Sequence, residues 1–92
     1  MKDYLDKYED DLCEELADAD KYACWALEIK EKYPDFAKRL KDIANQELNH
    51  YEIIDSMAAK VTTDEVEKKI YDHMHKRHLV KIAEIKYKIS LI

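Results

Sequence analysis

Hydrophobic residues recur every three or four positions along nearly the whole chain, and this spacing predicts helices. In the first third, every member of the repeating stripe is apolar or aromatic except one glutamate. The members are Leu5, Tyr8, Leu12, Glu15, Ala19, Tyr22, Ala26 and Ile29. A stripe of this kind marks the face of a helix that is turned toward a bundle core. The pattern predicts a first helix over about residues 3–32.

The only proline, Pro34, ends this pattern. The residue before a proline avoids the helical conformation, whereas proline itself suits the first turn of a helix. We therefore expect a second helix over about residues 35–60. Its stripe consists of Leu40, Ile43, Ala44, Glu47, His50, Tyr51, Ile54 and Met57. Charge enters this stripe at one level only, that of Glu47 and His50.

The next boundary is a polar run at residues 62–65, in which Thr62 and Glu65 have the spacing of a capping box. The third helix is expected over about residues 64–91. Its clean seam is Ile82, Ile85, Ile89 and Ile92, and the same seam continues backwards through His78, His75 and Tyr71. Because the connections are short, helices that follow one another should be antiparallel.

The composition strengthens the helical prediction. The chain of 92 residues has no glycine, one proline and 40% charged residues. Sheets usually need glycine in their tight turns, whereas exposed, ion-paired helices do not. We predict a single all-α domain over residues 1–92, an antiparallel helical hairpin with a long third helix. A domain this short buries a modest core, which oligomerisation or a bound metal often supplements.

The charge distribution bears on partners. Residues 1–31 hold eleven acids and four bases, whereas residues 64–92 hold five acids and seven bases, so we expect the first helix to pack beside the third. The net charge of −5 predicts no nucleic-acid partner. No stretch has the apolar length of a membrane span or signal peptide, so we expect a cytoplasmic protein without a membrane partner. Cys13 and Cys24 lie about 16 Å apart along one helix, too far apart for a disulfide.

The charged positions inside the stripes suggest metal chemistry. Glu47 and His50 stand three residues apart, on one helix face, and Glu15 is the only acid of the first stripe. Across a hairpin that turns near Pro34, all three fall within about two helical turns of one level. Two carboxylates and an imidazole suit iron, manganese or zinc. Tyr22, two turns after Glu15, is placed to hydrogen-bond a ligating carboxylate.

Residues 14–22 (Glu-Glu-Leu-Ala-Asp-Ala-Asp-Lys-Tyr) and 44–50 (Ala-Asn-Gln-Glu-Leu-Asn-His) resemble the first helical hairpin of the ferritin-like superfamily, as in bacterioferritin, rubrerythrin and the short encapsulated ferritins. The resemblance implies half of a di-iron (Fe2+/Fe3+) carboxylate centre. Glu15 would be a terminal ligand, Glu47 a bridging ligand and His50 the nitrogen ligand, with Tyr22 as the supporting phenol. The chain has no second Glu-x-x-His motif of that kind. The resemblance therefore implies a four-helix bundle and a metal site completed by a homodimer or higher oligomer.

The third helix offers a rival way to complete the site. Asp72, His75 and His78 fall at the same depth as Glu47 and His50, which would allow a mononuclear site within one chain. The other interpretation makes them surface or interface residues. For the whole protein, the leading hypothesis is ferroxidase-type or oxidant-handling activity. The alternatives are a helical oligomerisation module with a buried polar cluster, and a zinc-stabilised structural bundle.

Overall fold

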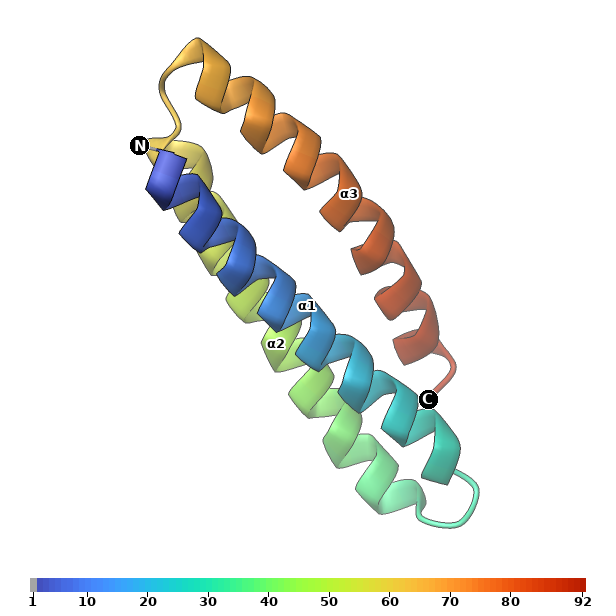
Figure 1. Cartoon of the computed structure of the whole chain (residues 1–92). Helices are drawn as coiled ribbons and strands as arrows, with labels where there is room; N and C mark the ends of the chain where they lie inside the picture. The colour runs from blue at the N-terminus through green and yellow to red at the C-terminus, as the bar shows by residue number, and fades with distance from the viewer. Residues whose placement is uncertain (1) are drawn as a thin grey trace.

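The computed structural model describes residues 2–92, with side chains from residue 5 onward, and consists of three α-helices joined by two short connections (Figure 1). Helix α1 spans Lys2–Ile29, α2 spans Pro34–Val61 and α3 spans Glu65–Ser90. No strand occurs within this described range. The predicted all-α fold with three helices is confirmed. The main difference is that α1 ends at Ile29 and not near residue 32.

The early end of α1 follows from the proline. Tyr33, which precedes Pro34, has φ −130° and ψ 68°, outside the helical region, as expected for a residue before proline. The carbonyl of Ile29 accepts hydrogen bonds from the backbone N–H groups of Lys32 (3.1 Å) and Tyr33 (2.7 Å). The chain therefore leaves the helix after Ile29, in a tight turn over residues 30–32, and α2 begins at Pro34 itself.

The start of α3 differs from the predicted capping box. The N-cap is Asp64, whose carboxylate accepts a hydrogen bond from the backbone N–H of Glu67 at 3.3 Å. The hydroxyl of Thr62 instead donates to the carbonyl of Ala58, at 2.6 Å, and so completes the end of α2. The expectation that Thr62 caps the third helix is wrong, because that hydroxyl already serves the preceding helix.

The three helices form a rod and not a sphere. Helices α1 and α2 lie side by side as an antiparallel hairpin, and α3 runs back in the direction of α1 and packs mainly along it (Figure 1). The molecule measures 51 × 17 × 15 Å, with a radius of gyration of 15.0 Å. A compact chain of this length would have a radius of gyration of about 12 Å. The rod therefore leaves long helix faces that this chain does not cover.

Small side chains lie at the centre of the α1–α2 contact. Ala19, Ala23, Ala26, Ala37 and Ala44 are almost completely buried, which lets the two helices approach closely. Larger core side chains complete the cluster and bring in α3: Leu12, Leu16, Leu48, Tyr51, Ile85 and Ile89. The core thus joins all three helices along the middle of the rod.

The predicted stripes of α1 and α2 are only half buried. In α1 the buried members are Leu5, Leu12, Ala19 and Ala26, and the half-exposed members are Tyr8, Glu15, Tyr22 and Ile29. In α2 the buried members are Leu40, Ala44 and Tyr51, whereas Ile43, Glu47 and Ile54 are half exposed and His50 and Met57 are exposed. The core instead includes Leu16 and Leu48, the residues that follow the two glutamates. The reason is that α3 packs on one side of the hairpin. The buried face of α1 and α2 is therefore turned toward α3 and away from the centre of the predicted stripes.

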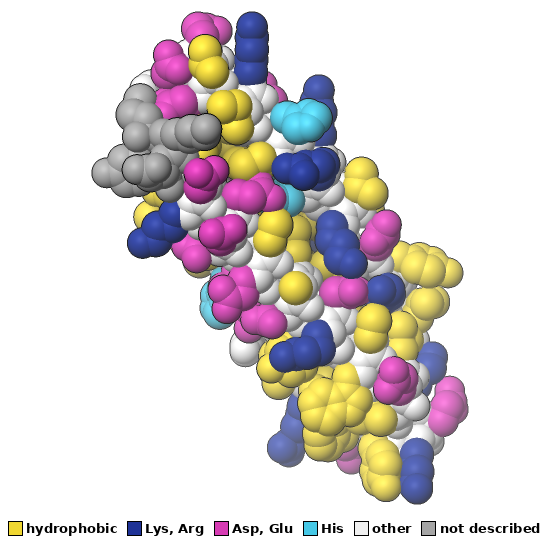
Figure 2. Space-filling model, viewed as in Figure 1, with side chains coloured by type: hydrophobic (Ala, Val, Ile, Leu, Met, Phe, Trp, Pro, Cys, Tyr) yellow, Lys and Arg dark blue, Asp and Glu magenta, His cyan; other side chains and the backbone are white. Residues whose placement is uncertain are grey.

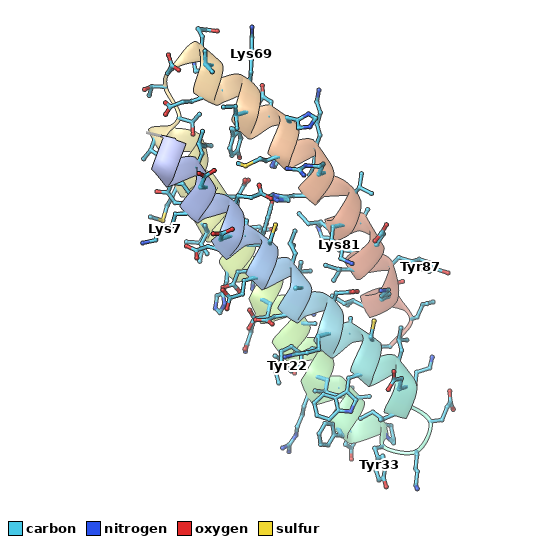
Figure 3. All side chains as sticks on the ribbon, in the orientation of Figure 1. Lys7, Tyr22, Tyr33, Lys69, Lys81 and Tyr87 are labelled. Carbon is cyan, nitrogen blue, oxygen red and sulfur yellow. The ribbon has the colours of Figure 1, made fainter. Side chains whose placement is uncertain are left out.

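Charge complementarity between α1 and α3 is confirmed. The carboxylate of Asp20 accepts hydrogen bonds from the ammonium groups of Lys88 (2.6 Å) and Lys81 (3.1 Å), and Figure 3 shows Lys81 reaching from α3 toward α1. Burial opposes ionisation of Asp20, but these two hydrogen bonds outweigh it and lower the pKa of the carboxyl. None of the helices, over residues 2–92, has the length and apolarity needed to cross a bilayer.

Candidate metal centre

The structure brings Glu15, Glu47 and His50 together at one point between α1 and α2. Nδ1 of His50 lies 3.5 Å from Oε2 of Glu15 and 3.8 Å from Oε2 of Glu47. One potential ligand atom from each of the three residues falls within 4.8 Å of the other two. Glu47 and His50 are neighbours on one turn of α2, and the hairpin places Glu15 of α1 opposite them. The arrangement joins two carboxylates and an imidazole, the donor set that the sequence predicted.

The three side chains differ in exposure. The carboxylates of Glu15 and Glu47 are 22% and 20% exposed, whereas the imidazole of His50 is 55% exposed. Oε2 of Glu15 is buried and has no hydrogen-bond partner among the described residues. A buried carboxylate oxygen without a partner is costly, and a proton or a cation removes that cost. The site is therefore closed on its glutamate side and open to solvent at the imidazole.

The electrostatics of Glu15 reflect this crowding. Its pKa is raised to about 7, first because its proton is shared with the neighbouring Glu47, and then because burial and the negative charge of Glu47 disfavour the ionised form. His50 acts in the opposite direction. Glu15 therefore keeps its proton to a higher pH than an ordinary glutamate when no metal is bound. A divalent cation bound here would replace that proton.

The cluster faces away from α3. Cys13 and Asp20 of α1 contact α3, and Glu15 lies about 200° around the helix from Cys13. On α2, Asp55 contacts α3, and His50 lies about 140° around the helix from Asp55. We refer to this uncovered side of the hairpin as the open face. It consists of the half-exposed and exposed stripe residues Tyr8, Glu15, Tyr22, Ile29, Ile43, Glu47, His50, Ile54 and Met57.

Tyr22 does not occupy the supporting position that the resemblance implied. Within the described residues, its hydroxyl forms no hydrogen bond with Glu15 or Glu47. The Tyr22 ring packs against the core, and the ammonium of Lys21 lies 4.7 Å from its centroid. The ring also borders an apolar pocket of about 350 Å³, together with Trp25, Phe36, Arg39, Leu40 and Ile43. Tyr22 is thus part of an apolar surface in this structure.

The third-helix residues do not join the cluster. His78 is buried against α1, where its Nε2 lies 3.3 Å from Oε1 of Glu9. The Nδ1 of His75 lies 3.4 Å from Oδ1 of Asp55, and Asp72 is exposed. The rival mononuclear site within one chain is therefore not formed. The reason is that α3 covers the side of the hairpin opposite to Glu47 and His50.

Chemically, the cluster is a small set of mixed oxygen and nitrogen donors. It offers two carboxylates, which tolerate hard cations in more than one oxidation state, and one imidazole on the solvent side. The donor chemistry and the unpartnered oxygen of Glu15 fit a divalent metal ion. Three protein donors leave several coordination positions of an octahedral ion to water or to another chain. A complete dinuclear centre requires further ligands, and among the side chains described, from residue 5 onward, no other group of metal-ligating side chains lies at this point.

A second group of ligand-type side chains was missed by the sequence reasoning. Glu9 and Cys13 of α1 meet His78 of α3, with ligand atoms again within 4.8 Å of one another. The available signal was the spacing of Glu9 and Cys13, four residues apart on one helix face. The partner histidine could not be identified because its position depends on how α3 docks.

A search for related proteins found no family model, curated protein or solved structure that matches this chain.

Proposed function

We propose that this chain is a metal-binding protein of the ferritin-like type, in which Glu15, Glu47 and His50 bind iron at a site shared with a second copy of the chain. The observation that carries the proposal is the convergence of these three donors, from two helices, on one point where a buried oxygen of Glu15 forms no hydrogen bond and lies 3.5 Å from the imidazole of His50. A cation at this point offsets the repulsion between the glutamates and provides that oxygen with a partner.

The donor set favours an ion that accepts mixed oxygen and nitrogen ligation, which iron, manganese and zinc all do. Iron is the proposed ion because the helical hairpin and its Glu, Glu-x-x-His spacing resemble those of di-iron carboxylate proteins. Bound iron supplies one-electron redox chemistry between Fe2+ and Fe3+, with oxygen or peroxide as the oxidant. The proposed activity is therefore that of a ferroxidase or an oxidant-handling protein.

The residues of the chain have distinct parts in binding. Glu15 releases its shared proton to solvent when the cation enters. Glu47, whose carboxylate is as enclosed as that of Glu15, would be the bridging ligand by the resemblance. The imidazole of His50 is the most exposed donor and lies on the side from which a cation arrives. The two carboxylates thus determine the negative charge of the site, and His50 determines how a cation reaches it.

The second copy is proposed because the open face resembles an uncovered interface. In a four-helix bundle the row of each helix that holds Glu15 or Glu47 would also be buried, but here this row of α1 and of α2 stays outside the core. This row holds apolar side chains on both sides of the ligand cluster, including Tyr22, Ile43 and Ile54. Packing two such faces about a two-fold axis would bring two half-sites together.

Aromatic residues extend this surface toward the α1–α2 turn. Trp25, Tyr33 and Phe36 are about half exposed, and the rings of Trp25 and Phe36 lie 5.4 Å apart. Figure 2 shows hydrophobic side chains gathered at this end of the hairpin. Such a patch on a chain of 92 residues supports association with another surface.

The ligand assignment is tested with Glu47→Ala and His50→Ala. Each variant is expected to abolish ferrous iron binding while leaving the helix content, measured by circular dichroism, unchanged. Glu52→Ala and His73→Ala are matched controls, because both remove an exposed residue of the same type outside the cluster. Full metal stoichiometry in both cluster variants would show that the assignment is wrong.

The metal-free helical module is the second candidate, and one observation favours it. Nδ1 of His50 approaches both carboxylates, so a protonated imidazole would itself offset part of their charge. In that case the cluster fixes the register of an oligomer. An oligomer that is unchanged by chelators, in a protein that takes up no iron, would establish this second function in place of the first.

A further inference from the structure

A second polar cluster lies on the other side of α1, where this helix packs against α3. Sγ of Cys13 is 3.0 Å from Oε1 of Glu9, and Nε2 of His78 is 3.3 Å from the same oxygen. The sulfur and the imidazole nitrogen are 3.9 Å apart. Three different ligand types therefore surround one point. This cluster is separate from the metal centre proposed above, and the inference goes beyond that function.

The triangle of donor atoms has the size of a zinc coordination face. With usual zinc–sulfur, zinc–nitrogen and zinc–oxygen bond lengths and tetrahedral angles, the donor–donor separations are about 3.3–3.6 Å. The three observed separations, 3.0, 3.3 and 3.9 Å, lie on both sides of this range.

The imidazole is already oriented as a ligand. His78 is buried, with 5% of its surface exposed, and its Nδ1 lies 3.2 Å from the hydroxyl of Tyr51. This contact fixes the plane of the ring and directs Nε2 toward Cys13 and Glu9. Histidine ligands of zinc commonly have such a hydrogen bond on the other ring nitrogen. Tyr51 is therefore a positioning residue for this cluster.

Glu9 provides a second indication that a cation binds here. Its Oε2 is buried and has no hydrogen-bond partner among the described residues. The guanidinium of Arg77 approaches only the other oxygen, at 3.9 Å. A cation between Glu9, Cys13 and His78 would be close enough to attract both carboxylate oxygens. A bound cation would thus explain both the unpartnered oxygen of Glu9 and the arrangement of the three donor atoms.

A pocket leaves room for a fourth ligand. A cavity of about 260 Å³ opens beside the cluster and is lined by Glu9, Cys13 and His78, with Leu16, Ala17, Arg77 and Lys81 around them. Zinc sites that have three protein ligands keep their fourth position for water or substrate. The cavity is large enough for that water and connects the cluster with solvent.

A cysteine nucleophile is the competing interpretation, and the surroundings of Cys13 argue against it. Burial, the hydrogen bond to Glu9 and the negative charge of Glu9 raise the pKa of the Cys13 thiol to about 11. A nucleophilic cysteine needs the opposite shift. A metal ion displaces the thiol proton directly, because the bond between zinc and the thiolate forms as the proton passes to water.

We propose that Glu9, Cys13 and His78 form a zinc site of the open, three-ligand type between α1 and α3, with water as the fourth ligand. Thiolate, imidazole and carboxylate together favour zinc, in contrast to the carboxylate-rich cluster on the open face. Zinc at this point also ties α3 to α1.

The test uses Co2+ as a spectroscopic substitute for Zn2+ in the reduced, full-length protein. The wild type is expected to show the near-ultraviolet charge-transfer band of a cobalt–thiolate bond and the intense visible bands of a tetrahedral ion, and Zn2+ should displace both. Cys13→Ser should remove the charge-transfer band, and Cys24→Ser, the matched control in the same helix, should retain it. Glu47→Ala should also retain the band, which separates this site from the iron site.

The carboxylate is tested with Glu9→Gln, which keeps the shape of the side chain. This variant is expected to bind Zn2+ more than about 10-fold more weakly, with unchanged circular dichroism. Cobalt binding without a thiolate band, a band that persists in Cys13→Ser, or unchanged zinc affinity in Glu9→Gln would each overturn the proposal.

Discussion

The surroundings of Glu15 differ from those of an ordinary surface glutamate. Its neighbours include a second carboxylate, Glu47, and one of its own oxygens is buried without a partner. In the metal-free protein the raised pKa of about 7 means that the folded state takes up a proton that the unfolded state, with a pKa of 4.5, has lost. The stabilisation from this proton is complete below pH 4.5 and is lost as the pH rises through about 7.

Glu15→Gln therefore has a pH-dependent effect on the metal-free protein. The substitution removes the ionised form, so it should raise the free energy of unfolding by about 1 kcal/mol at pH 8 and change it little near pH 4. Denaturant unfolding in the presence of a chelator at the two pH values measures this difference. Glu14→Gln, at the exposed neighbouring position, should show no such pH dependence. An equal effect of both substitutions at pH 8 would contradict the account of Glu15.

At the residue scale, the sequence predicted that Glu15, Glu47 and His50 lie close together, but not the surroundings of these residues. Glu15, Glu47 and His50 could be identified because each is a charged position within an apolar helical stripe. Tyr22 follows the same stripe, yet its hydroxyl is not at the carboxylates, because the position along a stripe does not determine where a long side chain points. The contacts of His78 depend on the docking of α3, which no local pattern specifies.

At the scale of elements, α3 is held to α1 by charge as well as by its isoleucines. Asp20 pairs with both Lys81 and Lys88, whereas Asp18 pairs only with Lys21 of its own helix, at 3.9 Å. The network around Asp20 is partly buried, so it should be stronger than an isolated surface pair.

Asp20→Asn should lower the free energy of unfolding by about 1 kcal/mol at neutral pH, and hydrogen exchange should show faster opening of α3. Because the pKa of Asp20 is lowered, the stabilisation from its ion pairs is lost only below pH 3.8, the ordinary pKa of aspartate. The destabilising effect of Asp20→Asn should therefore persist across the neutral pH range. Asp18→Asn is the matched control. Equal destabilisation by the two substitutions would show that the interhelical network does not hold α3.

The N-terminus of α3 allows a second test at this scale. Asp64→Ala removes the side chain that accepts the hydrogen bond from Glu67, and it should cost about 1 kcal/mol in thermal or denaturant unfolding. Thr63→Ala, at the adjacent exposed position, should cost much less. A larger loss in the Thr63 variant would place the cap at a different residue.

Helix number, type and approximate bounds were predictable because proline, caps and apolar periodicity act locally. The sequence did not allow a prediction of which row of each stripe is buried and which row is left open. The stripe around Glu15 and Leu16 is wide enough for either residue to enter the core, and the docking of α3 selects Leu16. The same selection leaves Glu47 at the edge of the core and Leu48 within it.

At the scale of the whole molecule, the proposed metal site requires two copies of the chain to associate through the open face. Met57 lies two turns after His50 on this face, and its side chain is half exposed. Tyr87 is more exposed but points away from α1 on α3 (Figure 3). Substituting glutamate at each of these two positions therefore distinguishes an effect on association from the general effect of adding a negative charge.

Met57→Glu should convert the dimer to a monomer and weaken iron binding by roughly 10-fold or more, although it leaves all three ligands in place. Tyr87→Glu should leave both mass and binding unchanged. Light scattering and iron titration on the same samples measure the two quantities. A dimer that survives Met57→Glu would mean that the subunits associate through another surface.

The most direct test of the central claim is an anaerobic titration of the wild-type protein with Fe2+, with the mass in solution determined on the same samples and air admitted at the end. We expect saturation near one iron per chain in a dimer, followed by the near-ultraviolet absorption of Fe3+ when oxygen enters. The absence of iron uptake, in a protein whose assembly is unchanged after chelation, would contradict the claim.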